Sequence, residues 1–205
     1  MMGLFITLEG VEGCGKTTQI TRLAEYLRSR GREVVCTREP GGTPVAEKIR
    51  ALLLDPAHKE MSPTAELLLY EAARAQHVDE LIRPALDAGK VVVCDRFADS
   101  TTAYQGAGRG LTAEAVTPLH ALATGGLWPD LTVVLDLAAE EGLRRAGHVG
   151  PSDRLEQEPL EFHERVRAGF LEIAEREPYR VKVVDATQSP EEVAQAIQTL
   201  VAPLL

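Results

Sequence analysis

Short, continuous apolar runs recur along the chain and alternate with segments whose apolar residues have helical spacing. Continuous runs of Val, Ile and Leu are typical of strands that are covered on both faces in a parallel sheet. The alternation of strands and helices predicts an α/β fold with one five-stranded parallel sheet flanked by helices. The predicted strands are 4–8, 34–37, 91–94, 132–137 and 181–184, and the predicted helices are 16–30, 44–54, 63–88, 112–124, 138–145, 158–175 and 190–202.

Length and composition are those of one compact domain. The chain has 205 residues, of which 44% are hydrophobic and 26% charged, and this balance excludes a disordered or fibrous protein. No apolar run approaches the ~18 residues that a spanning helix needs, and residues 1–10 lack the features of a secretory signal. We therefore expect a single domain over residues 1–205, located in the cytoplasm and without a membrane partner.

The net charge of −9 at pH 7 opposes non-specific attraction to nucleic acid or to anionic lipid. We expect no nucleic-acid partner, and any phosphate site must depend on a local cluster of cations. Arg outnumbers Lys 17 to 5, and the planar guanidinium suits bidentate phosphate contacts. Cys14, Cys36 and Cys94 are widely spaced, which predicts neither a zinc site nor a disulfide.

A phosphate-binding motif lies between the first predicted strand and the first predicted helix. Residues 10–17, GVEGCGKT, match the pattern GxxxxGK[ST]. Its glycines let backbone N–H groups point into the loop, and Lys16 can reach the β- and γ-phosphates of a nucleotide. The hydroxyl of Thr17 is suited to Mg²⁺. The predicted ATP-binding residues of the loop are Gly10, Val11, Glu12, Gly13, Cys14, Gly15, Lys16 and Thr17.

Proteins with this loop include switches, motors and small-molecule kinases. Guanine-specific switches read their base with an NKxD motif, and this chain has no asparagine. A motor or helicase needs a further domain and a nucleic-acid surface, which an acidic chain of 205 residues does not supply. A small kinase is the best remaining class.

Two other segments follow predicted strands. The third strand leads into Asp95 and Arg96 at the carboxyl edge of the sheet, where ligands bind in such folds. Asp95 can hold Mg²⁺ and Arg96 can bridge phosphates, although a surface ion pair is the plainer alternative. Residues 38–44, REPGGTP, suit either a rigid turn at a ligand or an ordinary tight turn.

Seven motifs follow one another along almost the whole chain. They are GVEGCGKTT at 10–18, TREPGGTPVAEKIR at 37–50, LLLYEAARAQH at 67–77, DRFADSTTAYQG at 95–106, PDLTVVLDL at 129–137, DRLEQE at 153–158 and VDAT at 184–187. Together they resemble the motifs of the bacterial thymidylate kinases, a family of P-loop nucleoside monophosphate kinases. The resemblance implies transfer of the γ-phosphoryl of ATP to dTMP, giving dTDP for dTTP biosynthesis, with Mg²⁺ and a homodimer. It also implies a short lid at about 144–156 and suggests a cis Glu39–Pro40 bond.

On the acceptor side, the resemblance implies that Tyr70 stacks on thymine and that Arg74, one helical turn later, bonds a base oxygen. Without the resemblance, they would be interpreted as a core aromatic and a solvated charge. Tyr104 would lie beneath the deoxyribose and exclude a 2′-hydroxyl, and Glu12 would lie near the 3′-hydroxyl and the metal. The implied acceptor-binding residues are Arg38, Tyr70, Arg74, Arg96, Thr101, Tyr104 and Gln105, with a less direct role for Arg50.

On the donor side, the phosphate loop has no arginine, so the resemblance implies that the lid supplies this cation. Arg144, Arg145 and Arg154 flank the lid tip, and whether Arg145 or Arg154 acts stays open. Adenine would lie between Arg144 or Arg145 and a loop that contains Thr187. The implied catalytic residues are Glu12, Lys16, Arg96, Arg145 and Arg154, and the implied metal-binding residues are Thr17 and Asp95.

Two alternatives to dTMP phosphorylation remain open. One is another pyrimidine nucleoside monophosphate kinase that acts on dUMP, UMP or CMP. The other is a non-catalytic ATP-binding module on the same fold. The five histidines are interpreted as surface or hydrogen-bonded residues, because a phosphate acceptor needs no strong base at neutral pH.

Overall fold

The computed structural model describes residues 3–147 and 153–205, so the tip of the expected lid, residues 148–152, lies outside the described residues. Within the described ranges the strands form one five-stranded sheet of order β2-β3-β1-β4-β5, and every neighbouring pair is parallel. This confirms the predicted fold class. The strands are β1 (Leu4–Glu9), β2 (Val34–Arg38), β3 (Val91–Asp95), β4 (Leu131–Asp136) and β5 (Val181–Asp185).

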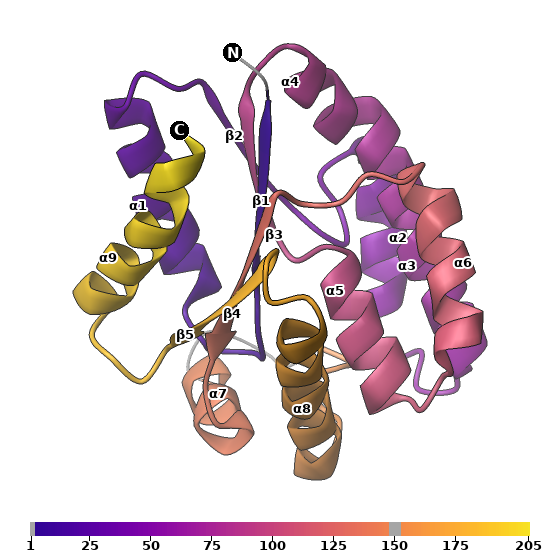
Figure 1. Ribbon diagram of the computed structural model, residues 1–205. Helices are drawn as coiled ribbons and strands as arrows, with labels where there is room; N and C mark the ends of the chain where they lie inside the picture. The colour runs from indigo at the N-terminus through magenta and orange to yellow at the C-terminus, as the bar shows by residue number, and fades with distance from the viewer. Residues whose placement is uncertain (1–2, 148–152) are drawn as a thin grey trace.

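Helices cover both faces of the sheet, which explains why its strands are continuously apolar (Figure 1). Helices α1 (Lys16–Ser29) and α9 (Pro190–Val201) lie on one face. The other face carries most of the remaining helices. The remaining helices of the described residues are α2 (Pro44–Leu54), α3 (Pro63–His77), η1 (Val78–Ile82), α4 (Arg83–Asp87), α5 (Ala98–Thr101), η2 (Thr102–Gly108), α6 (Ala113–Thr124), α7 (Ala139–Ala146) and α8 (Leu160–Arg176), and the short η3 (Ala202–Leu204) follows α9.

The predicted helix at 63–88 is continuous in the structure, but its middle widens into one π-helical stretch, η1. Pro84 lies just after this stretch. Because proline has no N–H to donate, a regular α-helical ladder cannot run unbroken across this point. The pattern therefore predicted the length of this helix and not its internal geometry.

A helical segment at 98–108, formed by α5 and η2, was missed by the sequence pattern. Its sequence, ADSTTAYQGAG, is rich in Ser, Thr and Gly, which are weak helix formers. This segment is stabilised as a helix by packing against α8. A Cβ on Gly169 of α8 would lie only 2.8 Å from the Cβ of Ala107. The missed helix carries three of the predicted acceptor residues, so tertiary packing positions much of the site.

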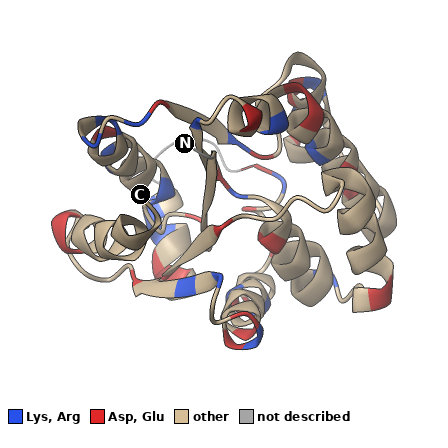
Figure 2. Cartoon of the chain, turned by 45° about the horizontal axis from the view of Figure 1, so that its top comes forward, with Lys and Arg blue, Asp and Glu red and all other residues tan. Residues whose placement is uncertain are grey.

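The carboxyl ends of the central strands meet at one edge of the sheet. Leu8 of β1 and Arg38 of β2 are both in register with Asp95 of β3. The loops after these three strands therefore lie together at this edge. Acidic and basic residues occur on helices on both sides of the sheet (Figure 2). Among the described residues, no helix combines the length and apolar character needed to cross a membrane.

Candidate active site

A cavity of about 230 Å³ opens at this edge of the sheet, against the phosphate loop. Its wall comes from the loops after β1, β2 and β3, from α3 and η2, and from the segment that precedes α8. The lining residues are Glu12, Gly13, Lys16, Glu39, Pro40, Arg50, Leu54, Tyr70, Arg74, Arg96, Phe97, Ser100, Thr101, Tyr104, Gln105, Asp153, Leu155 and Glu156.

The phosphate loop runs from the end of β1 into α1, as its motif predicts. Gly13 and Gly15 have φ angles of 66° and 95°, a backbone conformation that favours glycine. Lys16 is buried, and its Nζ donates to the carbonyl oxygens of Gly10 at 3.2 Å and Val11 at 2.9 Å. The amino group of Lys16 is thus held inside the loop.

Glu12, inside the phosphate loop, receives contacts from three distant parts of the chain. Arg96 Nη2 and His163 Nδ1 lie 3.3 and 3.2 Å from its carboxylate, and the hydroxyl of Tyr104 donates to it. Burial tends to raise the pKa of Glu12. Contact with His163 and the charges of Arg96 and Lys16 outweigh burial and lower that pKa to about 2. The carboxylate therefore stays ionised, and His163 is a site neighbour that no sequence spacing indicated.

Glu9, three residues earlier, has the opposite shift. It is fully buried, and its carboxyl oxygens lie 2.6 Å from the backbone nitrogen of Phe97 and 2.5 Å from Ser100 Oγ. Burial, with the nearby charge of Asp99, raises the pKa of Glu9 to about 8 despite these hydrogen bonds. Glu9 thus supports the segment after β3 as a carboxyl group that is largely neutral at neutral pH.

Arg96 has a φ of 70°, a conformation that no other non-glycine residue adopts in the described part of the chain. Such strain costs about 1–3 kcal/mol and persists where surrounding contacts fix it. Arg96 Nη1 donates to the carbonyl of Gly10 at 2.9 Å and to Ser100 Oγ at 3.2 Å, and the guanidinium lies over the ring of Tyr104. These contacts hold Arg96 at the cavity beside the phosphate loop.

Arg74 is fixed by a buried network. Its Nε donates to Glu39 at 2.8 Å and its Nη1 to Glu71 at 2.7 Å. Its Nη2 donates to the carbonyl of Phe97 at 3.1 Å and to Thr101 Oγ1 at 3.0 Å. Burial alone would lower the pKa of Arg74, but the two carboxylates raise it above its ordinary value. Four of its five N–H groups are engaged, so one remains for a ligand.

The other predicted base and sugar residues line the same cavity. Tyr70, Thr101, Tyr104 and Gln105 are all buried, and the first of these comes from α3 whereas the others come from α5 and η2. Burial raises the pKa of the Tyr70 hydroxyl, so it stays neutral. The structure thus brings these four residues together with Arg74, the fifth residue that the resemblance assigned to the nucleoside.

The sequence analysis gave Arg38 a direct role in acceptor binding and Arg50 a less direct one, but their positions favour the reverse. Arg50 lines the cavity, whereas Arg38 lies outside it, half-exposed and paired with Glu47 at 3.0 Å. Both donate to the carbonyl of Pro40, at 3.1 Å from Arg38 and 2.9 Å from Arg50. The Glu39–Pro40 peptide bond is cis, as the resemblance suggested.

The donor-side residues lie on α7 and on the loop after β5. Arg144 and Arg145 are both paired with Glu141, with each Nε at 2.7 Å from a carboxylate oxygen. Arg145 Nη1 also reaches the carbonyl of Ala186 at 3.5 Å. Thr187 is exposed, and its hydroxyl donates to Asp185 at 2.6 Å.

Helix α7 touches the phosphate loop through two glycines. A Cβ on Gly13 would meet the backbone oxygen of Gly142, and a Cβ on Gly142 would meet the backbone oxygen of Glu12. The same Cβ on Gly13 would lie 3.0 Å from the Cβ of Arg145. The stem of Arg145 is therefore next to the phosphate loop, as a donor-side cation needs to be.

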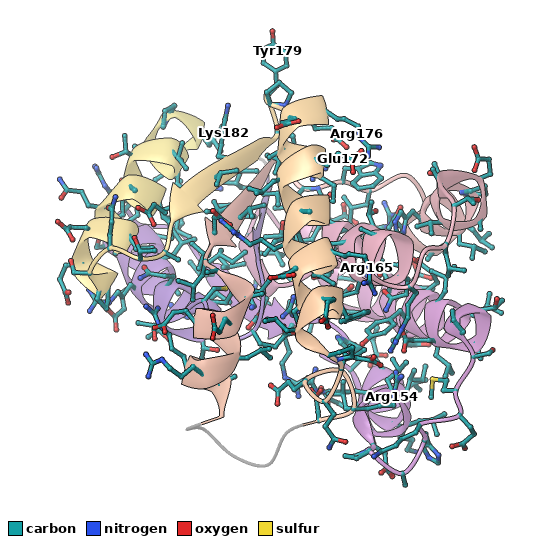
Figure 3. The ribbon with its side chains drawn as sticks, turned by 90° about the horizontal axis from the view of Figure 1, so that it is seen from below. Arg154, Arg165, Glu172, Arg176, Tyr179 and Lys182 are labelled. Carbon is teal, nitrogen blue, oxygen red and sulfur yellow. The ribbon has the colours of Figure 1, made fainter. Side chains whose placement is uncertain are left out.

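Arg154 is not brought to the phosphate loop in this structure. Its Nη1 lies 2.6 Å from Glu66, and its Nε donates to the carbonyl of Leu53 at 2.8 Å. Arg154 lies beside α2 and α3 and well apart from α7 (Figure 3). The sequence analysis left open whether Arg145 or Arg154 is the lid cation, and in this structure Arg154 is buried in an ion pair with Glu66.

The two residues predicted to bind metal lie at the sheet edge. Asp95 ends β3, and Thr17 is exposed in the first turn of α1. With the ionised carboxylate of Glu12, they offer carboxylate and hydroxyl oxygens. Oxygen ligands of this kind suit Mg²⁺, so the donor set fits the metal that the sequence indicated.

Comparisons with known proteins agree with one another. A family model described as "Thymidylate kinase" matches residues 8–197. A thymidylate kinase of Pseudomonas fluorescens Pf0-1 is 56% identical over 205 residues, covering 100% of this chain and 98% of the relative. One of Geotalea uraniireducens is 54% identical over 98% of this chain and 97% of the relative. The crystal structure of thymidylate kinase from Ehrlichia chaffeensis superposes with a TM-score of 0.80, at 35% identity, over 98% of this chain and 99% of that one.

Proposed function

The chain belongs to the thymidylate kinase family, and from this premise we propose how its residues carry out phosphoryl transfer. The enzyme transfers the γ-phosphoryl of ATP to dTMP and forms dTDP for dTTP biosynthesis. The observation that carries the residue assignments is that Arg74, Arg96 and the phosphate loop line one cavity. This arrangement supports a base beside Arg74 and phosphates beside Arg96 and the phosphate loop.

The acceptor nucleoside is proposed to lie along α3 and η2. Tyr70 stacks on the base, Arg74 donates its remaining N–H to a base oxygen, and Thr101 and Gln105 complete the polar wall. Tyr104 lies beneath the sugar and leaves poor room for a 2′-hydroxyl. The buried network around Arg74 supports this arrangement, because it orients the guanidinium before any ligand arrives.

The acceptor phosphate is assigned to Arg96, which is held between the phosphate loop and Tyr104. Arg50 is proposed as a second phosphate contact because it lines the cavity. Arg38, outside the cavity, shares the Pro40 carbonyl with Arg50 and so helps to orient this loop. A planar guanidinium can contact two phosphate oxygens at once, which favours arginine at these positions.

The donor phosphates are proposed to bind the N–H groups of the phosphate loop and the amino group of Lys16. Phosphoryl transfer depends on positioning and on neutralising the charge of the transferred group. Arg145 is assigned as the lid cation because its stem lies against the phosphate loop. Arg144 and Thr187 are assigned to the adenine side, and Arg154 stays with Glu66 in this conformation.

Mg²⁺ is proposed to be held by Thr17 and Asp95, with Glu12 nearby. When bound, the ion would neutralise phosphate charge as the γ-phosphoryl moves. The chain's own share of that task falls to Lys16 and Arg96. Glu12 stays ionised at neutral pH, so it can accept a hydrogen bond from the sugar 3′-hydroxyl as well as attract a cation.

A homodimer is proposed from the apolar residues exposed on the layer of helices around α3. Leu52 of α2, Leu68 of α3 and Leu122 of α6 are 40%, 51% and 81% exposed. A symmetric pair would cover these side chains with their own copies. We also propose that residues 1–205 form one domain with a lid at about 144–156, and that the enzyme works in the cytoplasm on its nucleotide substrates.

A coupled assay of ADP release tests the activity directly. We expect turnover that requires both ATP and dTMP, with a higher kcat/KM for dTMP than for dUMP, UMP or CMP. Absence of dTMP-dependent ADP release would contradict the assignment. A ranking with another pyrimidine monophosphate first would move the enzyme to the alternative that the sequence left open.

A further inference from the structure

The imidazole of His163 is fully buried and contacts the phosphate loop. It belongs to α8, and its Nδ1 lies 3.2 Å from Oε2 of Glu12, across 151 positions of sequence. Its other nitrogen, Nε2, has no hydrogen-bond partner among the described residues. Burial of a polar ring costs free energy unless its polar atoms find partners, so the contact with Glu12 is the one that offsets this cost.

The hydrogen atom of this contact belongs to the imidazole. The carboxylate of Glu12 is ionised, since its neighbours lower its pKa to about 2 despite its burial. An ionised carboxylate has no proton to donate and only accepts hydrogen bonds. Nδ1 of His163 therefore carries a hydrogen and donates it to Glu12.

The two carboxylate oxygens of Glu12 are used unequally. Oε1 accepts from Arg96 Nη2 at 3.3 Å and from the hydroxyl of Tyr104. Oε2 has His163 as its one partner among the described residues. Each carboxylate oxygen has about two acceptor sites, so Oε1 is filled and Oε2 keeps one site free. Because Glu12 lines the cavity, this free site can serve a ligand there.

Helix α8 is held in place at this point by close packing on η2. A Cβ on Gly108 of η2 would lie 2.7 Å from a ring carbon of Phe162 and 3.0 Å from Cγ2 of Val166. Phe162 comes directly before His163 on α8, and Val166 comes one turn later. The imidazole is therefore a rigid support, and its hydrogen bond sets the plane of the Glu12 carboxylate.

The proposed function supplies the group that would use the free site, the 3′-hydroxyl of the acceptor sugar. We propose that His163 is a positioning residue for phosphoryl transfer, which aims the free acceptor site of Glu12 Oε2 at this hydroxyl. Arg96 and Tyr104 hold only Oε1, so without His163 the carboxylate could turn about that oxygen. The proposal rests on the proposed placement of dTMP, and its test separates the two.

The test compares dTMP with 3′-deoxythymidine monophosphate, which lacks the 3′-hydroxyl. A hydrogen bond to a charged group contributes ~10- to 100-fold, so wild-type kcat/KM should favour dTMP by that factor. In His163→Leu, Oε2 loses its donor and the carboxylate can turn, so this ratio should fall at least ~5-fold. A merely structural loss would lower kcat/KM for both substrates and leave their ratio as in wild type.

Two further variants make the result specific. Asn and Leu branch alike at Cγ, but Asn places an N–H donor close to the position of Nδ1. His163→Asn should therefore keep the ratio within ~2-fold of wild type. Ile173 is buried further along α8, away from Glu12. Ile173→Ala should lower the melting temperature and leave the ratio unchanged, because it opens a cavity and removes no polar contact.

Wild-type enzyme gives a second measurement that requires no variant to fold. With ¹⁵N-labelled histidine, the NMR signals of the His163 ring report which nitrogen carries the hydrogen. We expect a hydrogen on Nδ1, and an Nδ1 signal that shifts more when dTMP binds than when the 3′-deoxy analogue binds. An Nδ1 without hydrogen, or equal shifts with the two nucleotides, would overturn the proposal.

The kinetic outcomes are also distinct. An unchanged ratio in folded His163→Leu, an equal fall in Ile173→Ala, or a loss in His163→Asn as large as in His163→Leu would each overturn the role of His163 and leave the proposed function in place. Equal kcat/KM for both nucleotides in wild type would overturn it through the placement of the 3′-hydroxyl. Absence of dTMP-dependent turnover in wild type would instead contradict the proposed function itself.

Discussion

The two parts of the site that we propose to bind the acceptor and the donor are built in different ways. We call the residues around Arg74 the acceptor wall, and Arg144 and Arg145 on α7 the donor arm. Arg74 of the acceptor wall is 2% exposed and is held by two carboxylates, one from its own helix and one from the loop after β2. Arg144 and Arg145 of the donor arm are 62% and 39% exposed, and both depend on Glu141 within their own helix. One side is fixed by long-range burial, and the other by a local pairing at the surface.

Because of this difference, we expect activity and stability to be coupled on the acceptor side of the site and separable on the donor side. Removing one member of a buried pair leaves an uncompensated charge and costs about 3–5 kcal/mol, whereas an exposed pair contributes about 0–1 kcal/mol. Variants of the acceptor wall should therefore lose stability together with binding. Variants of the donor arm should lose turnover while the fold stays intact.

Arg145→Ala should give the largest change in activity, and this loss of activity should occur without a loss of stability. An arginine that neutralises the transferred phosphoryl contributes ~10³ to 10⁵ in turnover, so kcat should fall in that range. The melting temperature should stay within error, because the Arg145–Glu141 pair is exposed. Arg154→Ala is the comparison. If it lowers kcat and Arg145→Ala does not, the lid cation is Arg154.

Arg74→Met should show the reverse coupling. Without the guanidinium, Glu39 and Glu71 keep their buried charges and only their contacts with His77 and His120, so the free energy of unfolding in urea should fall by about 3–5 kcal/mol. KM for dTMP should rise in the same variant. Arg144→Met removes an exposed arginine and should leave the free energy of unfolding unchanged within error. Equal losses in both variants would erase the contrast between the two sides.

Gly142→Ala tests whether the donor arm is positioned by contact with the phosphate loop. The added methyl group would meet the backbone oxygen of Glu12, so α7 must move away and carry Arg145 with it. A displacement of about 1 Å can cost ~10²-fold in rate, and we expect kcat to fall by ~10- to 100-fold. Gly147→Ala is the matched control, because its Cβ would lie 3.5 Å from the nearest atom. Wild-type kcat in Gly142→Ala would show that the contact is not needed.

Glu9 and Glu12 should make stability depend on pH in opposite ways. The pKa of Glu9 is about 8 in the folded protein against 4.5 as its ordinary value. Between these pH values the folded protein holds a proton that the unfolded chain releases, so stability falls as pH rises. Glu9→Gln should reduce this fall by at least ~1.4 kcal/mol, the equivalent of one pKa unit.

Glu12 should act on the acid side instead. Its folded pKa of about 2 lies below the ordinary 4.5, so its contribution is present above pH 4.5 and lost as pH falls toward 2. Glu12→Gln should flatten this acid limb and leave the limb between pH 4.5 and 8 as in wild type. Urea unfolding at a series of pH values measures both limbs. Identical profiles for the two variants would contradict the opposite shifts.

The sequence predicted the sheet and the phosphate loop because their signals are local. The run at 91–94 is apolar whatever lies around it, and GVEGCGKT specifies its own turn. It did not predict α5 and η2, whose Ser, Thr and Gly residues become helical only by packing on α8. Thr101, Tyr104 and Gln105 were assigned by resemblance, and the helical segment that carries them was missed.

For a related reason, the sequence did not indicate the buried residues that hold the site residues in place. In the sequence alone, Glu66 looks like an ordinary surface carboxylate and Glu9 like the last residue of a strand. His163 looks like a solvent-exposed histidine. Glu66 meets Arg154 across 88 positions of sequence, and His163 meets Glu12 across 151. No periodicity or spacing links such residues, so only burial reveals which carboxylates must be paired.

From the sequence alone, we could infer the class of fold, the phosphate-loop motif and the family, since these depend on short segments with fixed local geometry. Tertiary structure decided the rest. It set Arg145 against the phosphate loop, enclosed Arg154 beside Glu66 and gave Glu9 and Glu12 opposite pKa shifts. The physical reason is that the energy of a charge depends on its desolvation and its neighbours, and both are assembled from distant parts of the chain.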